Sequence, residues 1–213
     1  MNRGRILSVW VILFLTFDTI AFAASPSLMK GEKLPDINLT IPKNSDEKIY
    51  LGLSGEGVFK TSQVKAQAVL IKIFNLYCQT CQSTAGIMTE IYEQIENNPD
   101  LKGKIKLIGI GAGNNLSEIE VFKQNHNISF PIFPDEDFTI HKALGEVKNP
   151  FFIAVKMEGG ESPEIVHTHL GGLTDARAFL DLIVEAYGIK KEDLLIKEAA
   201  SLTKESLSDL KLE

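Results

Sequence analysis

The sequence predicts an α/β fold with a central mixed sheet flanked by helices. Two nearly continuous apolar segments, residues 68–75 (AVLIKIFN) and 104–112 (KIKLIGIGA), have the pattern of buried strands, and a helical pattern follows each. Two later strand patterns, residues 151–157 and 164–170, are separated only by the turn-forming EGGESP. Strands joined by crossover helices are parallel and a hairpin is antiparallel, so the sheet is expected to be mixed.

The part of the chain before the first buried strand contains weaker patterns. Residues 25–36 form a leader that contains Pro, Gly and Lys, and residues 37–42 and 49–53 are short segments typical of strands. We expect these two strands as peripheral N-terminal additions to the sheet.

Amphipathic helices are predicted after both buried strands. The first helix begins at Cys78 or Gln79 and ends at Asn97. Its apolar face carries an isoleucine every four residues: Ile87, Ile91 and Ile95. The second helix begins at a capping-box pattern formed by Ser117 and Glu120.

The remaining elements complete the sheet and its cover. Residues 128–135 contain two prolines, which favours an edge strand or a connecting segment, and residues 138–144 suit a short helix. A closing helix is predicted at residues 174–187. Its expected core face consists of Phe179, Leu182, Ile183 and Ala186.

We expect one domain between two terminal segments. Residues 1–23 have the layout of a secretory signal peptide: Arg3 and Arg5 precede an apolar run, and small residues follow up to Ala23, after which we expect cleavage. The alternative is an uncleaved membrane anchor, because the apolar run nearly has the length of a bilayer span. Residues 24–189 then form the domain, and residues 190–213 form a C-terminal helical extension or tail.

Export and charge restrict the function. Either interpretation of the N-terminus predicts a periplasmic or other extracytoplasmic location. The whole chain has a formal charge of −6, and removing residues 1–23 changes it to −7. Since nucleic-acid phosphates require cations, an acidic protein of this kind is not expected to bind nucleic acid.

The chain has only two cysteines, Cys78 and Cys81, two residues apart. Exported proteins often use disulfides as staples. A bridge between these two cysteines would close so short a loop that it removes little entropy from the unfolded chain. The spacing therefore indicates chemistry rather than stabilisation.

The predicted position of the pair indicates thiol–disulfide exchange. Cys78 lies where a buried strand meets a helix, and free backbone N–H groups and the helix dipole there favour a thiolate, the attacking species in disulfide exchange. Cys81 follows one helical turn later, on the same side, where it can attack the mixed disulfide formed at Cys78. We expect Cys78 as the nucleophile and Cys81 as the resolving thiol.

Several motifs resemble one known family across residues 31–188. They are GEKLPD at residues 31–36, the strand leading into YCQTC at residues 77–81, the segment FPIFPDEDFTIHKALG, and Asn149-Pro150 before the strand FFIAV. With these motifs the chain resembles the exported thiol-disulfide oxidoreductases of the TlpA and ResA kind, which are related to redoxins.

The resemblance implies a thioredoxin-like fold and a reaction with protein dithiols or disulfides. It implies a cis proline at Pro150 opposite the cysteine pair, with Asn149 and Tyr77 beside it in a substrate groove. It also implies a reductant rather than an oxidant, acting on apocytochrome or other exported disulfides with electrons from a membrane donor. No metal, nucleotide, haem or other cofactor is required.

The chain departs from the family around the cysteines. Tyr77 replaces the usual tryptophan, Gln79-Thr80 lacks the common proline, and Thr84 stands where many relatives have an acid. Lys72 occupies the strand position of a buried aspartate in thioredoxins and of an asparagine in many TlpA-like proteins. We therefore expect no side-chain base close to Cys81, and the Gln-Thr pair does not indicate the direction of electron flow.

Two other uses of the cysteines are alternatives. A thiol peroxidase would require Pro and Thr upstream of Cys78 in a pattern that is missing. A non-enzymatic thioredoxin-fold binding or assembly module would carry a permanent or vestigial disulfide. Haem attachment is excluded because Gln82, not His, follows the second cysteine.

Two further patterns suggest ligand sites but have simpler explanations. His167 and His169 alternate on one strand and could bind a metal together with thiols, yet a half-buried strand pair explains them better. Residues 109–115 (GIGAGNN) follow a strand, but the third glycine of a dinucleotide motif is missing. We expect a tight strand-to-helix turn there.

Overall fold

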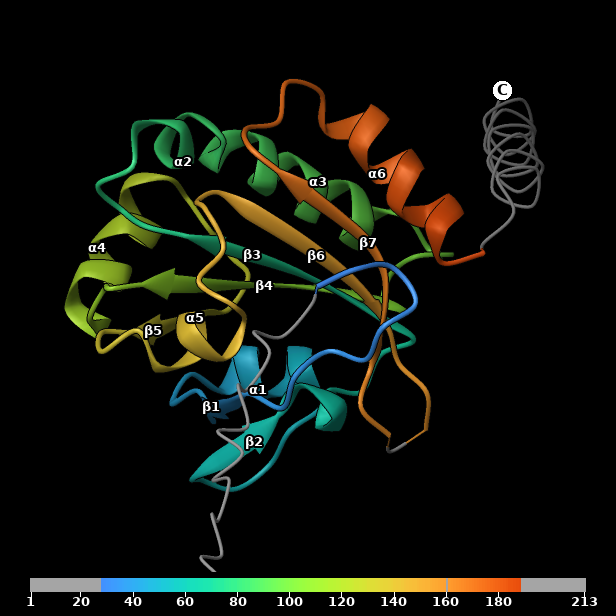
Figure 1. Ribbon diagram of the computed structural model, residues 1–213, viewed down its shortest axis with the longest axis horizontal. Helices are drawn as coiled ribbons and strands as arrows, with labels where there is room; N and C mark the ends of the chain where they lie inside the picture. Colours follow the sequence, from blue (N-terminus) through green and yellow to red (C-terminus); the bar gives the residue numbers. More distant parts are fainter. Residues whose placement is uncertain (1–27, 160, 189–213) are drawn as a thin grey trace, which may run out of the picture.

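The computed structural model describes residues 28–159 and 161–188 (Figure 1). The predicted signal peptide (residues 1–23) and C-terminal extension (residues 190–213) lie outside these residues. No helix within the described part of the chain is long and apolar enough to span a membrane.

Strands and helices alternate along the first half of the described chain, and a strand pair and a helix close it. In order, the elements are β1 (Asn38–Thr40), α1 (Ser45–Leu51), β2 (Val58–Lys60), the short 3-10 helix η1 (Thr61–Gln63), β3 (Ala68–Phe74), α2 (Gln79–Ser83), α3 (Ala85–Asn97), β4 (Ile105–Ala112), α4 (Leu116–Asn125), β5 (Ile132–Asp135), α5 (Thr139–Ala143), β6 (Phe151–Lys156), β7 (Glu164–Leu170) and α6 (Ala176–Ala186).

The main sheet has five strands in the order β5-β4-β3-β6-β7. β3 pairs in parallel with β4, and β4 with β5, whereas β6 is antiparallel to both β3 and β7. The predicted mixed sheet is thus confirmed, and the segment predicted as an edge or connecting piece contributes the edge strand β5, with residues 128–131 as the connection before it. β1 and β2 form a separate antiparallel pair.

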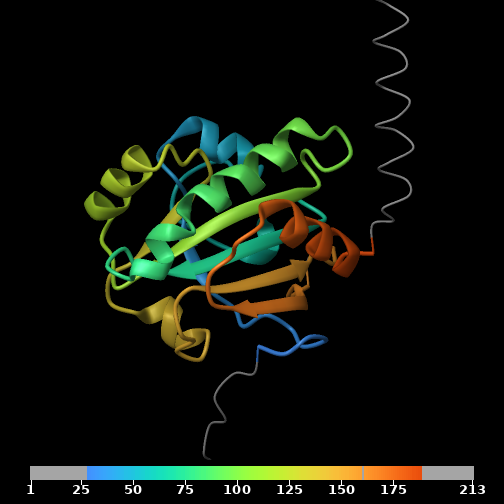
Figure 2. The same cartoon turned by 90° about the horizontal axis from the view of Figure 1, so that it is seen from above.

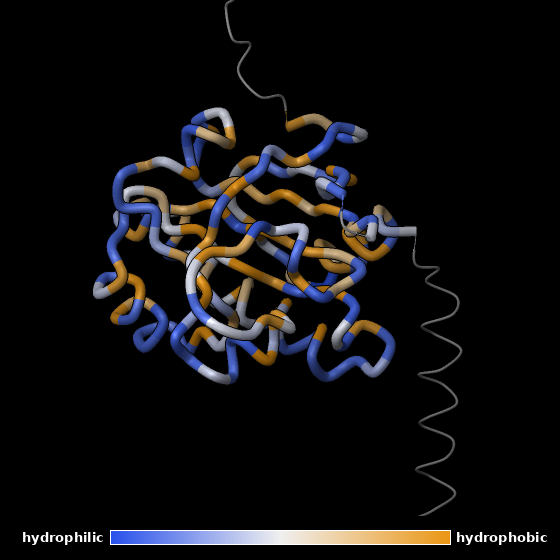
Figure 3. Tube along the Cα trace, turned by 90° about the horizontal axis from the view of Figure 1, so that it is seen from below, coloured by the Kyte–Doolittle hydropathy of each residue, from blue (hydrophilic) through white to orange (hydrophobic). Residues whose placement is uncertain are grey.

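Helices cover both faces of the sheet (Figures 1 and 2). One apolar cluster joins the sheet to α3, α4 and α6, and the other joins it to α1, α5 and the β1–β2 pair. Figure 3 shows hydrophobic residues along the central strands and hydrophilic residues on the surrounding loops. Burial on both faces explains why β3 and β4 have nearly continuous apolar sequences.

One predicted peripheral strand is wrong. Residues 49–53 lie largely in helix α1, whose N-cap Asn44 accepts hydrogen bonds from the amides of Asp46 and Glu47. Ile49 is 76% exposed whereas Leu51 is fully buried, which is the one-sided burial of a helix packed against the core. The partner of β1 is instead β2, which the sequence analysis did not identify.

The predicted helices need three corrections. The capping box of α4 is formed by Asn115 and Glu118, two residues earlier than expected. The helix that follows the cysteines is interrupted at Thr84, which separates α2 from α3. Leu182 of α6 is 43% exposed, and its place in the core is taken by Leu180 and neighbouring residues.

Candidate functional site

Cys78 and Cys81 lie directly beyond the carboxyl end of the central strand β3. Cys78 is the N-cap of α2, and its Sγ accepts a hydrogen bond from the amide of Cys81 at 3.3 Å. Both are free thiols, but Cys78 is half-buried and Cys81 is fully buried. Only Cys78 can therefore be reached directly by a large partner.

Three side chains hold the loop that leads into Cys78. Asn75 donates to the carbonyl of Ala112 at 2.7 Å, and its Oδ1 accepts from the amide of Tyr77. Asn114 Oδ1 accepts from the amide of Leu76 at 3.0 Å, and Gln82 donates to the Leu76 carbonyl. The sequence analysis assigned none of these residues to the site, although an asparagine directly after a buried strand is a signal for such a turn.

Asn149 and Pro150 face the cysteines from the start of β6. Their peptide bond is cis. The Cys78 thiol donates to the carbonyl oxygen of Asn149 at 3.9 Å, and the carbonyl of Pro150 accepts from the amide of Gly171. The side-chain Oδ1 of Asn149 is buried without a hydrogen-bond partner among the described residues. The structure thus brings together Cys78, Asn149 and Pro150 from distant parts of the chain.

Tyr77 lies on the exposed rim of the site, with 75% of its surface accessible. Its hydroxyl hydrogen-bonds to the carboxylate of Glu118, and this bond holds the pKa of Glu118 below its usual value. Beside Tyr77 lies an open apolar hollow of about 390 Å³ whose lining includes Leu76, Val121 and Phe122. The surface next to Cys78 is therefore partly apolar.

Lys72 lies beneath the cysteines, in the middle of β3, and is only 2% exposed. Its Nζ lies 3.4 Å from the carbonyl oxygen of Cys81 and 3.3 Å from Oγ1 of Thr84. Burial lowers the pKa of Lys72 to about 8, although the two cysteines partly oppose this shift. The expectation that no side-chain base lies near Cys81 is therefore wrong, because an amine occupies that position.

The second thiol is poorly ionised in this environment. Burial raises the pKa of Cys81, and the hydrogen bond between the two thiols raises it further, whereas the positive charge of Lys72 opposes the shift. Cys81 is consequently a thiol at neutral pH. A buried, protonated Cys81 behind an accessible Cys78 suits a sequence of attack by Cys78 and then by Cys81.

The histidine pair has a packing role. The rings of His167 and His169 both lie against Phe179 of α6, with centroid separations of 6.5 and 5.7 Å. Burial lowers the pKa of His167. Residues 28–159 and 161–188 contain no group of three or more His, Cys, Asp or Glu side chains arranged to hold a metal.

In the glycine-rich segment at residues 109–115, the first four residues are the end of β4, and residues 113–115 form the expected strand-to-helix turn. The amide of Asn114 donates to the carbonyl of Gly111, and Gly113 has a φ of 71°. A Cβ on Gly113 would lie 2.3 Å from the ring of Phe138. The glycine is required by backbone conformation and by this close approach, not by a nucleotide.

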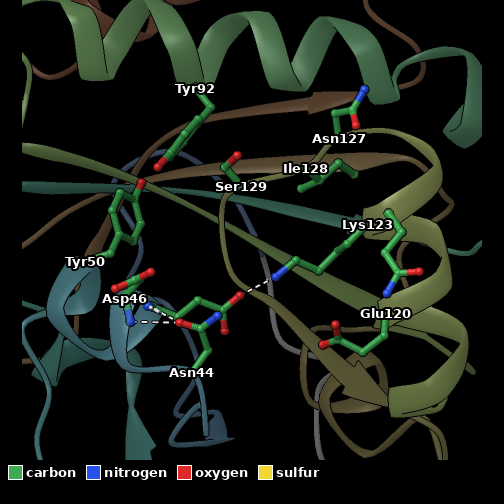
Figure 4. A pocket seen from close by; sticks show the side chains of 11 residues that line it. Asn44, Asp46, Tyr50, Tyr92, Glu120, Lys123, Asn127, Ile128 and Ser129 are labelled. Carbon is green, nitrogen blue, oxygen red and sulfur yellow. Dashed lines mark hydrogen bonds and ion pairs between the residues drawn. The ribbon is translucent and has the colours of Figure 1, made fainter.

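A larger polar hollow of about 620 Å³ lies away from the cysteines (Figure 4). Residues of α1, α3, α4 and the segment after α4 line it, and the ion pair between Glu47 and Lys123 crosses it. None of its lining residues belongs to the cysteine site.

Comparison with known proteins finds sequence similarity along most of the chain. No family model matches. The sequence is similar to the thiol-disulfide oxidoreductase ResA of Halalkalibacterium halodurans, with 25% identity over 186 residues that cover 86% of this chain and 93% of that protein.

Solved structures with related names share the fold. A candidate thiol:disulfide interchange protein DsbE from Chlorobium tepidum matches with a TM-score of 0.57 and 18% identity over 76% of this chain and 99% of that chain. The thioredoxin domain of a thiol-disulfide oxidoreductase from Bacteroides vulgatus matches with a TM-score of 0.54 and 16% identity, over 74% and 99% of the two chains.

The sheet order and these matches show a thioredoxin-like fold, and the sequence is similar to a thiol-disulfide oxidoreductase. The similarity to ResA supports the predicted resemblance to proteins of the TlpA/ResA kind.

Proposed function

We propose that this protein exchanges disulfides with the thiols of exported proteins, with Cys78 as the nucleophile and Cys81 as the resolving thiol. The observation that carries the proposal is the arrangement of the two sulfurs. Cys78 caps a helix and is accessible, while Cys81 is fully buried one turn behind it.

The reaction begins with the thiolate of Cys78. The amide of Cys81 donates to its sulfur and stabilises negative charge there. Attack on a substrate disulfide breaks the substrate S–S bond, forms a mixed disulfide with Cys78, and releases one substrate thiolate. The thiolate of Cys81 then attacks Sγ of Cys78, which forms the Cys78–Cys81 disulfide and releases the second substrate sulfur.

The substrate polypeptide would bind along Asn149, Pro150 and Tyr77. The carbonyl of Asn149 lies within 3.9 Å of the attacking sulfur, so a chain that pairs with the backbone there would place its own sulfur close to Cys78. The exposed ring of Tyr77, directly before Cys78, offers an apolar contact.

Reduction of exported disulfides is the direction that we favour, with a membrane protein as the electron donor. The resemblance to ResA supports this direction. The N-terminal pattern of residues 1–23 supports an extracytoplasmic location, through either a cleaved signal peptide or a retained anchor.

The exchange activity can be tested by reduction of insulin with dithiothreitol, comparing the wild type with Cys78→Ser. We expect the wild type to accelerate reduction and the variant to match the uncatalysed rate. Equal rates for the two proteins would overturn the proposal and favour a non-enzymatic module. The direction requires a separate measurement of the Cys78–Cys81 reduction potential, in which a low value supports a reductant.

A further inference from the structure

Lys72 is a buried amine without a carboxylate partner. It lies in the middle of the central strand, with 2% of its surface exposed. Within residues 28–159 and 161–188 it forms no salt bridge, and its polar contacts are the carbonyl of Cys81 and the hydroxyl of Thr84. Burial of an amine without an ionic partner lowers the free energy of unfolding, because the amine loses its hydration. Stability therefore does not explain why a lysine occupies this position.

The titratable groups that act on Lys72 are the two cysteines. Both come from α2 and its N-cap, and their charges favour the protonated amine. On its own strand the neighbouring group is the ring of Phe74, whose centroid lies 5.1 Å from Nζ. On β6 the cross-strand partner is Phe152, and on β7 the ring of His169 packs against Phe152 at 5.9 Å.

The amine therefore has one chemical counterpart in its surroundings, a thiol that must ionise. Cys81 is fully buried, and its ionisation requires both a proton acceptor and a compensating charge. Lys72 can provide both, because a neutral amine accepts a proton and the resulting ammonium stabilises the thiolate. Its pKa of about 8 leaves a useful fraction of the amine neutral near pH 7.5.

We propose that Lys72 takes the proton of Cys81 when this thiol resolves the mixed disulfide, an inference that rests on the proposed exchange function. The amine and the thiol become an ammonium and a thiolate. The thiolate attacks Sγ of Cys78, the Cys78–Cys81 bond forms, and the bond from Cys78 to the substrate breaks. Its electron pair leaves with the substrate sulfur, which is protonated by solvent, and the ammonium later returns its proton to solvent.

The first test measures ionisation of Cys81 without any catalysis. In a Cys78→Ala background, NMR of a ¹³Cβ-labelled Cys81 reports the pH at which the thiol ionises. Because the Lys72 amine is largely neutral above pH 8, we compare Lys72→Met with Lys72→Arg, whose positive charge persists, and expect the arginine to lower this midpoint by about one pH unit or more relative to methionine. The same midpoint in both variants would overturn the proposal, even if the protein proved to have no exchange activity.

The second test separates the two steps of exchange in single turnovers with a disulfide peptide. Lys72→Met should form the mixed disulfide at Cys78 at nearly the wild-type rate but resolve it about tenfold more slowly at pH 7 or below, with loss of the inflection near pH 8. Lys72→Arg keeps the positive charge but cannot accept a proton, so resolution should stay slow. Restoration of the wild-type rate by arginine would overturn proton transfer.

The matched control is Lys106→Met. Lys106 is also a buried lysine, 7% exposed on the adjacent strand β4, but its Nζ lies over the ring of Tyr50 at 4.0 Å rather than beside the cysteines. We expect wild-type kinetics of resolution. An equal slowing in the two lysine variants would show that Lys72 acts only through the fold. The exchange function itself is tested separately, by insulin reduction with the wild type and Cys78→Ser, which both retain Lys72. Equal rates there would overturn the exchange function.

Discussion

The side-chain oxygen of Asn114 accepts a hydrogen bond from the backbone amide of Leu76 at 3.0 Å. This bond joins the loop after β4 to the loop after β3, two residues before the nucleophilic Cys78. Asn114 is fully buried, so the bond is shielded from water. The position of Cys78 therefore depends on a residue that lies far from it in the sequence.

Replacement of Asn114 by Ala should destabilise the protein and loosen the site. The amide of Leu76 would lose its acceptor in a buried position, which costs about 1 to 3 kcal/mol of the free energy of unfolding. Urea denaturation measures this cost, and insulin reduction should slow in parallel. The exposed Asn125→Ala is the control, and a loss of stability as large as that of Asn114→Ala would contradict this explanation.

The sequence predicted correctly those elements whose local pattern of apolar residues is compatible with only one type of secondary structure. All seven residues of β3 are buried, and its nearly continuous apolar sequence identified it. Residues 49–53 were assigned to the wrong element because five residues do not distinguish a strand period from a helix period. The side chain of Asn44, which caps α1, was the missed signal.

In the site, too, the residues that could be predicted are those that belong to local sequence motifs. The spacing of Cys78 and Cys81 and the Asn149-Pro150 motif are local in sequence, and they gave the candidate residues. The contacts of Asn114 and Lys72 are different, because they depend on the parallel register of β3 with β4 and on where α2 crosses β3. No local pattern carries that information.

Gly113→Ala should be strongly destabilising. Gly113 has a φ of 71°, and its added Cβ would meet the ring of Phe138 at 2.3 Å. Gly103 has a similar φ of 75° with no atom within 4 Å of a Cβ. Backbone strain alone predicts a loss of about 1 to 2 kcal/mol for Gly103→Ala, and the clash adds about 1 to 3 kcal/mol at Gly113. Equal losses in thermal or urea unfolding would show that the Phe138 contact is unimportant.

Cys81→Ala should trap the mixed disulfide. The first attack by Cys78 does not need the second thiol, but resolution does, so the variant should accumulate a covalent complex with a disulfide-bonded substrate. Non-reducing gel electrophoresis or intact mass measurement detects this complex. The double variant with Cys78→Ala is the control and should form none. Absence of the complex in the single variant would contradict the assignment of Cys78 as the attacking thiol.

Lys72→Met should stabilise the protein at neutral pH, although it slows the proposed reaction. The amine is buried, and its pKa in the folded protein is about 8, below its usual value of 10.5. Below pH 8 the folded protein therefore carries a desolvated charge, and its removal should add about 1 to 3 kcal/mol to the free energy of unfolding.

The pH dependence of this difference has a defined sign. Between about pH 8 and pH 10.5 the unfolded wild type binds a proton that the folded protein has released, so the Lys72 contribution to stability rises with pH. The advantage of Lys72→Met should therefore be largest below pH 8 and should shrink by pH 9. Urea denaturation at pH 6.5 and pH 9 measures both differences, with the exposed Lys43→Met as a control expected to change stability by less than about 0.5 kcal/mol. An advantage that is the same at both pH values would mean that the Lys72 amine does not titrate in this range.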